Sequence, residues 1–190
     1  MSAQQLVSRL GTLHHSLHND GAHMLERILT TAETMLADRG CAGVTRTAHA
    51  LQTIEEGLPV LSSAEQDLYV HVEDKVGVKF ARCVLERGRK AVIVSVDGPT
   101  TFTKKECEGR AVQFMSARTL LENVTRHCLV PAHERITSLP DGLEPAQLPK
   151  LLDTDPIAQY HAWPVGTLVR ITRVFGGHQP TPFYRVVAAG

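Results

Sequence analysis

The stretch LPKLLDTDPIAQYHAWPVGTLVRITRVFGGHQPTPFYRVV, residues 148–187, decides the fold of the C-terminal part of the chain. Asp155 is a good N-cap and Pro156 a good first helical residue, because proline lacks the N–H that would be unpaired there. Residues 167–174 are rich in β-branched side chains and alternate apolar with polar, which predicts a strand. Residues 183–187 predict a second strand after a glycine- and proline-containing break. The stretch therefore predicts a short helix followed by a β-hairpin with a long loop.

The residues before this stretch change from helical to mixed patterning. Leucines spaced by four, three and four residues within 6–17 predict one amphipathic helix, and two further apolar stripes follow it. Strands and helices then alternate, which predicts a small sheet with helices on both faces and right-handed crossovers. Strands are predicted at residues 67–72, 91–96 and 111–115, helices at 76–85, 102–107 and 117–126, a linker at 58–63 and an irregular segment at 131–145.

Length, composition and charge limit the classes of protein. The 190 residues suit one large domain or two small ones, and the longest apolar run, residues 91–96, is too short to cross a bilayer. The four cysteines contain no C-x-x-C pair, so reduced thiols in an intracellular protein are expected rather than a disulfide framework or a cysteine zinc site. Net charge is zero, but residues 1–74 carry four Arg against ten Asp/Glu (−6), while residues 75–110 carry nine Lys/Arg against four Asp/Glu (+5). The basic segment is either a face for an acidic partner or a solvated face balanced by the acidic segment.

Five short motifs in the C-terminal stretch resemble one known family. They are Leu148-Pro149, Asp155-Pro156-Ile157-Ala158-Gln159-Tyr160, Gly166, Val169 to Arg173, and Tyr184-Arg185-Val186-Val187. In this order they resemble the C-terminal assembly domain of the fifth subunit of eukaryotic DNA-dependent RNA polymerases, a family with an archaeal counterpart. The hairpin loop, residues 174–182, departs from the family pattern.

The resemblance extends more weakly toward the N-terminus. The matching segments are Asp38-Arg39-Gly40, Lys75-Val76-Gly77-Val78-Lys79, the loop at residues 98–104, and the junction from Asn123 to His133. The loop keeps a glycine, a proline, threonines and a lysine but not their family order. The chain therefore resembles a divergent member of the family.

The resemblance implies a fold of class α+β or α/β in two domains. Residues 1–126 would form an α/β jaw domain, restriction-endonuclease-like, with a small sheet covered by helices on both faces. Residues 127–190 would form a small α+β assembly domain with a β-hairpin.

The resemblance also implies a function. The chain would be a non-catalytic polymerase subunit in the nucleus, with the assembly domain on the largest subunit and the jaw along downstream duplex DNA. A paralogue dedicated to one enzyme, such as RNA polymerase I in the nucleolus, is one form of this hypothesis. The alternative is a free-standing transcription regulator that keeps the fold and binds transcription factors or DNA. Neither hypothesis includes a cofactor, a metal, a membrane or a small-molecule substrate.

Three groups of residues carry these expectations. The DNA-facing candidates are Gly98, Pro99, Thr100, Thr101, Lys104 and Lys105, whose lysines are expected near the start of a short helix with free N–H groups that attract phosphate. The docking candidates are Asp155, Pro156, Ile157, Tyr160, Arg173, Tyr184 and Arg185. The junction candidates are His127, Pro131 and His133.

Catalytic and metal sites are weakly supported. A restriction-type nuclease needs an Asp on one strand and a Glu-x-Lys on the next, but Asp67 and Glu73 fall on one predicted strand. His14 and His18 share a helix face without an H-E-x-x-H motif, so we expect an exposed surface rather than a metal site.

Overall fold

The computed structural model describes residues 21–72, 75–174 and 179–190. The chain divides into an N-terminal unit that ends at Glu122 and a C-terminal unit, Asn123–Gly190, each with its own sheet. This confirms the predicted α+β class. The helix predicted at residues 6–17, the candidate histidines His14 and His18, the Glu73-Asp74 pair and part of the hairpin loop lie outside the described residues. Among the helices described, none has the length and apolar character needed to cross a membrane.

The N-terminal unit is built on a five-stranded sheet. Its strands, in spatial order, are β1 (Thr45–Arg46), β2 (Leu61–Ser62), β3 (Gln66–His71), β4 (Lys90–Ser95) and β5 (Val112–Ser116). The first three pair antiparallel, whereas β3, β4 and β5 are parallel, as the two strand–helix–strand repeats require. The predicted linker at residues 58–63 is wrong, because it contains β2 and the buried side chains of Val60 and Leu61.

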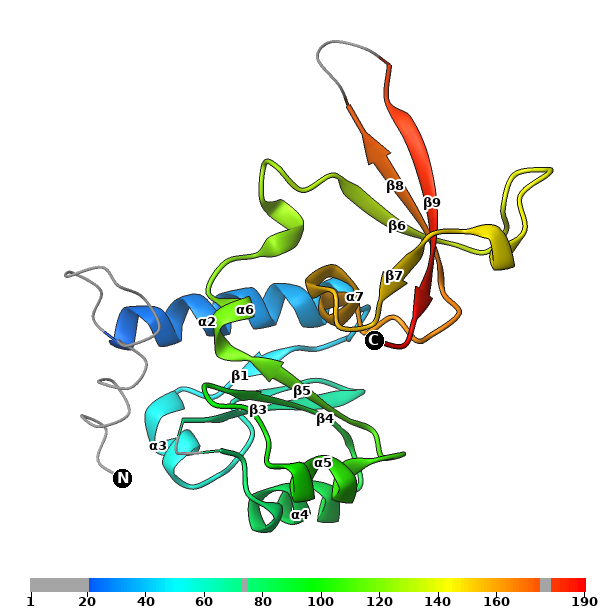
Figure 1. Cartoon of the computed structure of the whole chain (residues 1–190). Coiled ribbons are helices and arrows are strands. Elements are labelled where there is room, and N and C mark those ends of the chain that lie inside the picture. The colour runs from blue at the N-terminus through cyan, green and yellow to red at the C-terminus, as the bar shows by residue number, and fades with distance from the viewer. Residues whose placement is uncertain (1–20, 73–74, 175–178) are drawn as a thin grey trace. The chain divides into compact units, whose positions relative to one another are not determined.

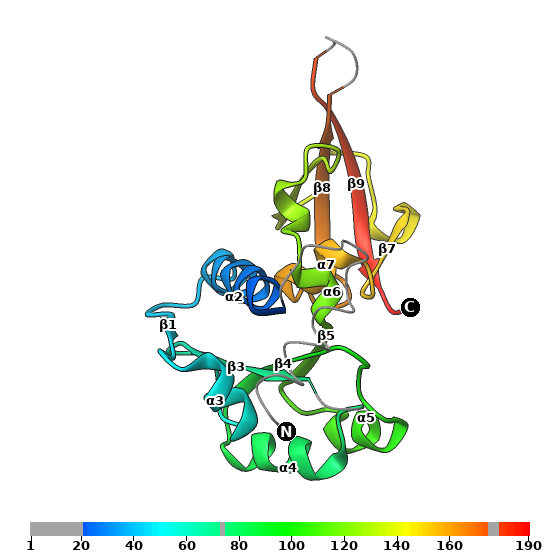
Figure 2. The same ribbon diagram turned by 90° about the vertical axis from the view of Figure 1, so that its left-hand side faces the viewer.

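Helices cover both faces of this sheet, as predicted. They are α2 (Gly21–Asp38), α3 (Ala50–Glu55), α4 (Val78–Glu86), α5 (Thr101–Cys107) and α6 (Ala117–Leu120). The crossover helices α4 and α5 lie together on one face, and α2 and α6 lie on the other (Figures 1 and 2). Tyr69, Val84 and Ile93 are buried between the sheet and α4, with Phe80 packed beside them. This packing fixes the ends of the parallel strands, from which the loop before α5 emerges.

The helix predicted at residues 117–126 is shorter than expected. Helix α6 ends at Leu120, and a separate 3₁₀ turn, η1 (Val124–Arg126), follows. Asn123 begins this turn with extended backbone angles, and its side chain accepts a hydrogen bond from the Thr125 N–H. Asparagine offers such a local partner readily, and the chain leaves the α-helix to form it.

The C-terminal unit contains a four-stranded sheet in the order β6-β8-β9-β7. The strands are β6 (Ala132–Ile136), β7 (Lys150–Leu152), β8 (Leu168–Arg173) and β9 (Thr181–Ala188), accompanied by α7 (Pro156–His161) and the 3₁₀ turn η2 (Pro145–Gln147). The predicted hairpin is β8–β9, and β6 pairs antiparallel with β8. The prediction of an irregular segment at 131–145 is wrong for β6, whose sequence AHERI is too polar to signal a strand.

The core of the C-terminal unit joins α7 to one face of its sheet. Leu151, Val169, Ile171 and Val187 from three strands are buried with Ala158, and the half-buried Trp163 packs against them. Trp163 therefore contributes to the core of this unit.

Candidate functional site

The loop between β4 and α5, which holds the DNA-facing candidates, is fastened to Val76. The Val76 N–H donates to the Gly98 carbonyl over 2.9 Å, and the Val76 carbonyl accepts from the Thr100 N–H over 3.2 Å. Pro99 forms a parallel bridge with Val76, and Gly98 adopts a φ of 73°, which glycine tolerates best. These contacts give the loop a fixed shape.

Threonines cap the helix that follows this loop. The Thr100 Oγ1 accepts from the Thr103 N–H over 3.2 Å, so the first turn of α5 already has a side-chain partner. Thr101 is exposed at the start of the helix. Lys104 and Lys105 lie in its last turn. The prediction that these lysines sit at the helix start is therefore wrong, because the helix is only seven residues long and begins at Thr101.

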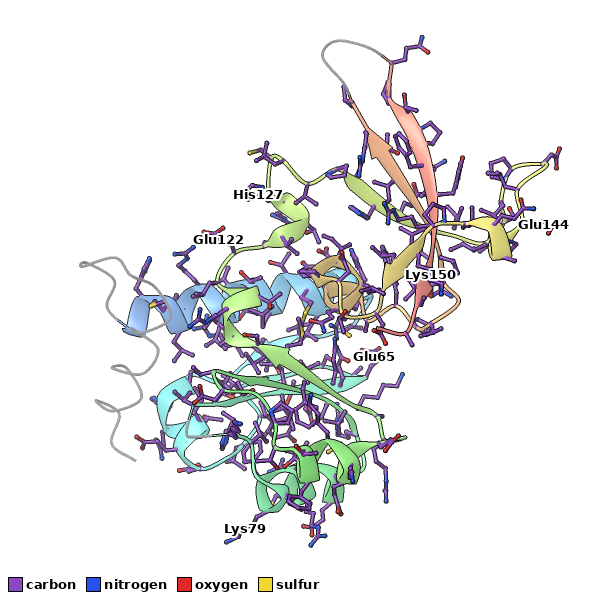
Figure 3. The ribbon with its side chains drawn as sticks, viewed as in Figure 1. Glu65, Lys79, Glu122, His127, Glu144 and Lys150 are labelled. Carbon is purple, nitrogen blue, oxygen red and sulfur yellow. The ribbon has the colours of Figure 1, made fainter. Side chains whose placement is uncertain are left out.

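The charges around the loop are mainly exposed and positive. Arg82 of α4 and Glu106 of α5 form a two-point ion pair, with N–O distances of 3.0 and 3.2 Å. The hydrogen bond from Arg82 lowers the pKa of Glu106. Lys104 and Lys105 are exposed and have no carboxylate within 4.0 Å among the residues that the structure describes. Lys79 of α4 also points away from the protein (Figure 3).

The docking candidates in α7 mainly shape the C-terminal unit. The Asp155 Oδ1 accepts from the Ile157 N–H over 2.8 Å and caps the helix, as predicted. Pro156 is exposed at the first helical position. Ile157 and Tyr160 are buried, and Tyr160 is 1% exposed. The Tyr160 hydroxyl accepts a hydrogen bond from the Asn123 amide over 3.2 Å, which links α7 to the turn η1.

The docking candidates in the sheet lie on two faces. The Arg173 guanidinium lies over the Phe183 ring at 5.3 Å, and Arg185 donates to the Lys150 carbonyl over 3.0 Å. Arg173 and Arg185 share a face by strand register, whereas Tyr184 lies on the opposite face, across from Arg170. The sequence motif therefore does not form one continuous patch.

The junction residues make local contacts. The His127 Nδ1 accepts from the Leu129 N–H over 3.3 Å. The His133 Nδ1 lies 2.7 Å from the Pro131 carbonyl, which accepts a hydrogen bond from it. Each histidine thus stabilises a turn, and no group of three potential metal ligands occurs in the described part of the chain.

Asp67, which the nuclease hypothesis required, is engaged elsewhere. It is buried on β3 and pairs with the Arg89 Nε over 3.1 Å. Glu73 and Asp74 lie outside the described residues.

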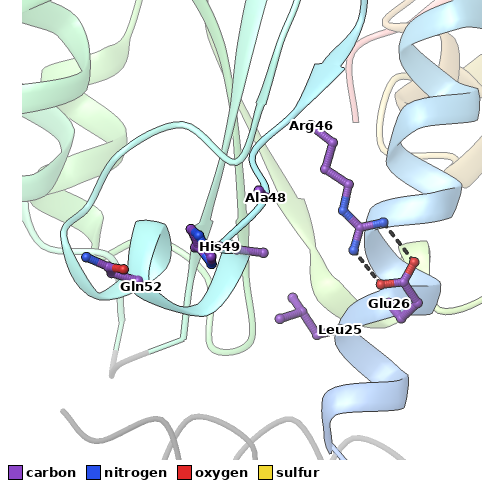
Figure 4. A pocket seen from close by; sticks show the side chains of 7 residues that line it. Leu25, Glu26, Arg46, Ala48, His49 and Gln52 are labelled. Atoms are coloured by element: carbon purple, nitrogen blue, oxygen red, sulfur yellow. Dashed lines mark hydrogen bonds and ion pairs between the residues drawn. The ribbon is translucent and has the colours of Figure 1, made fainter.

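A surface pocket of about 430 Å³ opens between α2 and α3 (Figure 4). Arg46 forms a two-point ion pair with Glu26 at its wall, and it also lies 3.7 Å from Glu33. The hydrogen bond from Arg46 lowers the pKa of Glu26. The charged side chains along this wall are therefore paired with each other.

Three positioning residues were missed in the sequence. Val76 and Thr103 hold the β4–α5 loop, and Asn123 connects η1 to α7. The Thr100-x-x-Thr103 and Asn123-x-Thr125 spacings are recognisable capping signals. Val76 acts through its backbone, which no side-chain pattern can reveal.

Comparison with known proteins identifies the C-terminal unit. Residues 122–187 match the family described as "RNA polymerase Rpb5, C-terminal domain". Similar proteins include "DNA-directed RNA polymerases I, II, and III subunit RPABC1" of Caenorhabditis briggsae and of Caenorhabditis elegans, each 28% identical over 127 residues. The matches cover 58% of this chain, and the chain spans 60% of the length of each of these curated relatives. These findings confirm the resemblance noted in the sequence: residues 122–187 match the C-terminal domain of the RNA polymerase Rpb5 family, and the chain is similar over 127 residues to two RPABC1 subunits.

Proposed function

We propose that the chain is a non-catalytic subunit of a multisubunit DNA-dependent RNA polymerase. The match of residues 122–187 to the Rpb5 C-terminal domain carries the proposal, and the names of the two nematode relatives support it. In this role, nucleotidyl transfer and its magnesium site belong to other subunits. The proposed place of action is the nucleus.

The C-terminal unit would dock on the largest subunit. Its exposed or half-exposed candidates, Pro156, Arg173, Tyr184 and Arg185, could reach a partner directly. Asp155, Ile157 and Tyr160 would act by shaping α7, because they cap the helix or are buried. The junction candidates His127, Pro131 and His133 would set the path of the chain into β6.

The N-terminal unit would lie along downstream DNA. The loop at residues 98–101 is held by backbone hydrogen bonds to Val76, and Lys104 and Lys105 are exposed beside it with no carboxylate within 4.0 Å among the described residues. Lysines in this setting would contact phosphates rather than bases, so binding would be positional and salt-sensitive.

A dedication to one polymerase, with RNA polymerase I and the nucleolus as the first case to test, is a finer form of the proposal. The altered loops at residues 98–104 and 174–182 support divergence of this chain from shared subunits. Equal recovery with all nuclear polymerases would exclude it.

The deciding experiment is gentle affinity purification of the tagged chain followed by mass spectrometry. We expect both large polymerase subunits to co-purify, and the identity of the largest will show which polymerase is bound. Arg173→Glu should reduce their recovery, whereas Lys79→Glu, an exposed charge reversal in the other unit, should not. Recovery with transcription factors alone would replace the proposal with the free-standing regulator.

A further inference from the structure

The register of the C-terminal sheet places three arginines on one face. Arg135 of β6 lies opposite Val169 of β8, which lies opposite Arg185 of β9. Directly opposite residues share a face, and every second residue along a strand returns to it. Arg173, four residues after Val169, therefore lies on this face, and so does Phe183, two residues before Arg185. We call Arg135, Arg173, Arg185 and Phe183 the arginine face; they lie beside Val169, Ile171 and Val187, which share this face of the sheet and are buried with Ala158 of α7.

The arginine face carries uncompensated positive charge. Strands β6, β8 and β9 contain four arginines and one carboxylate, Glu134, which gives a net charge of +3. Glu134 lies on the opposite face, where it pairs with Arg170. Arg135 and Arg173 have no carboxylate within 4.0 Å in the part of the chain that the structure describes. The positive charges of Arg135 and Arg173 are therefore not neutralised by a carboxylate of the described residues.

Strand β6 is also an open edge of the sheet. It pairs with β8 on one side, and no strand among the described residues pairs with its other side. Its five residues exceed the three of β7 at the opposite edge. An open edge presents alternating N–H and C=O groups, to which an extended peptide can add as a further strand. The side chains of such a strand would alternate between the arginine face and the other face.

We propose that the β6 edge and the arginine face bind an extended acidic segment of a partner polypeptide. The segment adds a strand beside β6 and places a carboxylate next to Arg135, where a guanidinium can bind it through two parallel hydrogen bonds. Its acidic residues lie at alternate positions on the side of Arg135, and the apolar residues between them lie on the side of Ile136. The inference specifies how the C-terminal unit would dock. It rests on the proposed function, which makes the partner a polymerase subunit.

The surface fits a polypeptide better than a nucleic acid. Single-stranded nucleic acids bind through bases stacked on open aromatic rings. Phe183, 41% exposed on this face, already has the Arg173 guanidinium over its ring. The strand edge also presents carbonyl groups, which repel phosphates but accept hydrogen bonds from peptide N–H groups.

The test is fluorescence anisotropy of a labelled octapeptide that alternates glutamate with valine, titrated with the purified full chain. We expect saturable binding that is lost with the matching glutamine–valine peptide. Arg135→Gln should weaken binding about tenfold, the loss expected for a two-point charged contact. Lys150→Gln removes one exposed charge from β7, whose side chain lies on the other face, and should leave affinity within about twofold.

Two N-methylated peptides, one modified at the glutamates and one at the valines, test strand addition itself. In an added strand, every second N–H group points toward β6 and donates to it. The peptide that is methylated at these positions must therefore lose binding. Equal binding of both, or of the glutamine–valine peptide, overturns the inference. Tighter binding of a single-stranded thymidine octanucleotide, weakened by Arg135→Gln, assigns the face to nucleic acid and also overturns it. If the peptide fails while polymerase subunits still co-purify with the tagged chain, this inference alone is wrong.

Discussion

The Thr103 hydroxyl donates a hydrogen bond to the Val76 carbonyl over 2.7 Å and so connects two segments that are 27 residues apart. The same carbonyl accepts from the Thr100 N–H, and the Thr100 and Thr103 hydroxyls lie 2.8 Å apart. The β4–α5 loop, which holds the DNA-facing candidates, is therefore part of the N-terminal fold. Its shape exists before any partner binds.

Thr103→Val should destabilise the chain by about 1–2 kcal/mol, because it removes a buried hydroxyl while nearly preserving shape. Thr103 is fully buried, so water cannot replace the lost donor. Urea unfolding measures the change. Thr101→Val, an exposed threonine in the same helix, is the control and should change stability by less than about 0.5 kcal/mol. Equal effects of the two substitutions would contradict the role assigned to Thr103.

The Lys104→Gln/Lys105→Gln double variant should weaken binding of duplex DNA and reduce its dependence on salt. Each lysine that neutralises a phosphate contributes about 0.9 to the slope of log K against log salt, so the slope should fall by about two. Binding of a labelled duplex at several salt concentrations measures it. The control removes the same charge at Lys90 and Lys150, both exposed and outside this loop. An unchanged slope in the lysine double variant would remove this loop from the DNA interface.

The sequence correctly predicts those helices and strands that have a clear capping residue or a clear apolar pattern. Asp155 and Pro156 mark the start of α7, and the β-branched run ending at Arg173 marks β8. Strand β6 cannot be recognised in the sequence. It is an edge strand with both faces partly exposed, so its residues do not have to alternate between apolar and polar. Its pairing with β8, and with it the arginine face, depends on register across 36 residues, which no local pattern reveals.

The sequence likewise reveals the residues that build the fold more readily than the residues that can contact a partner. The helical motif from Asp155 to Tyr160 is easy to recognise because it specifies a fold, and three of its side chains are buried for that reason. Arg135 belongs to no motif, yet its side chain is exposed. A motif that preserves structure is therefore a poor guide to which side chains touch a partner.

Asp155→Ala should cost about 1 kcal/mol, because it removes the side-chain acceptor for the Ile157 N–H at the start of α7. Asp155→Asn keeps an oxygen acceptor and should cost much less. Thermal unfolding of both variants measures the difference. Equal losses would mean that the carboxylate charge, rather than the cap, stabilises the helix.

Asn123→Ala should cost about 1–2 kcal/mol, because it removes the donor to the Tyr160 hydroxyl together with the Oδ1 acceptor for Thr125. In a Tyr160→Phe background the same substitution should cost less, because the contact with the Tyr160 hydroxyl is already absent. Urea unfolding of the four proteins gives the coupling energy. Additive losses would show that the contact does not stabilise the unit.

Cys107 should make the stability of the chain fall at alkaline pH. Burial raises the pKa of its thiol above the ordinary value of 9.0. Below that value both the folded and the unfolded chain keep the proton, so the thiol has no effect on the free energy of unfolding. Above it the unfolded chain loses the proton while the folded chain retains it, which favours unfolding as pH rises.

The comparison of wild type with Cys107→Ala isolates this effect from other groups that titrate at alkaline pH. The wild type should lose more unfolding free energy than the variant between pH 8 and pH 10, conditions that span the ordinary pKa. Ellman's reagent should modify the exposed Cys83 and Cys128 at once and Cys107 only after denaturation. Rapid modification of Cys107 in the folded chain, or parallel pH profiles of the two proteins, would contradict its burial at the end of α5.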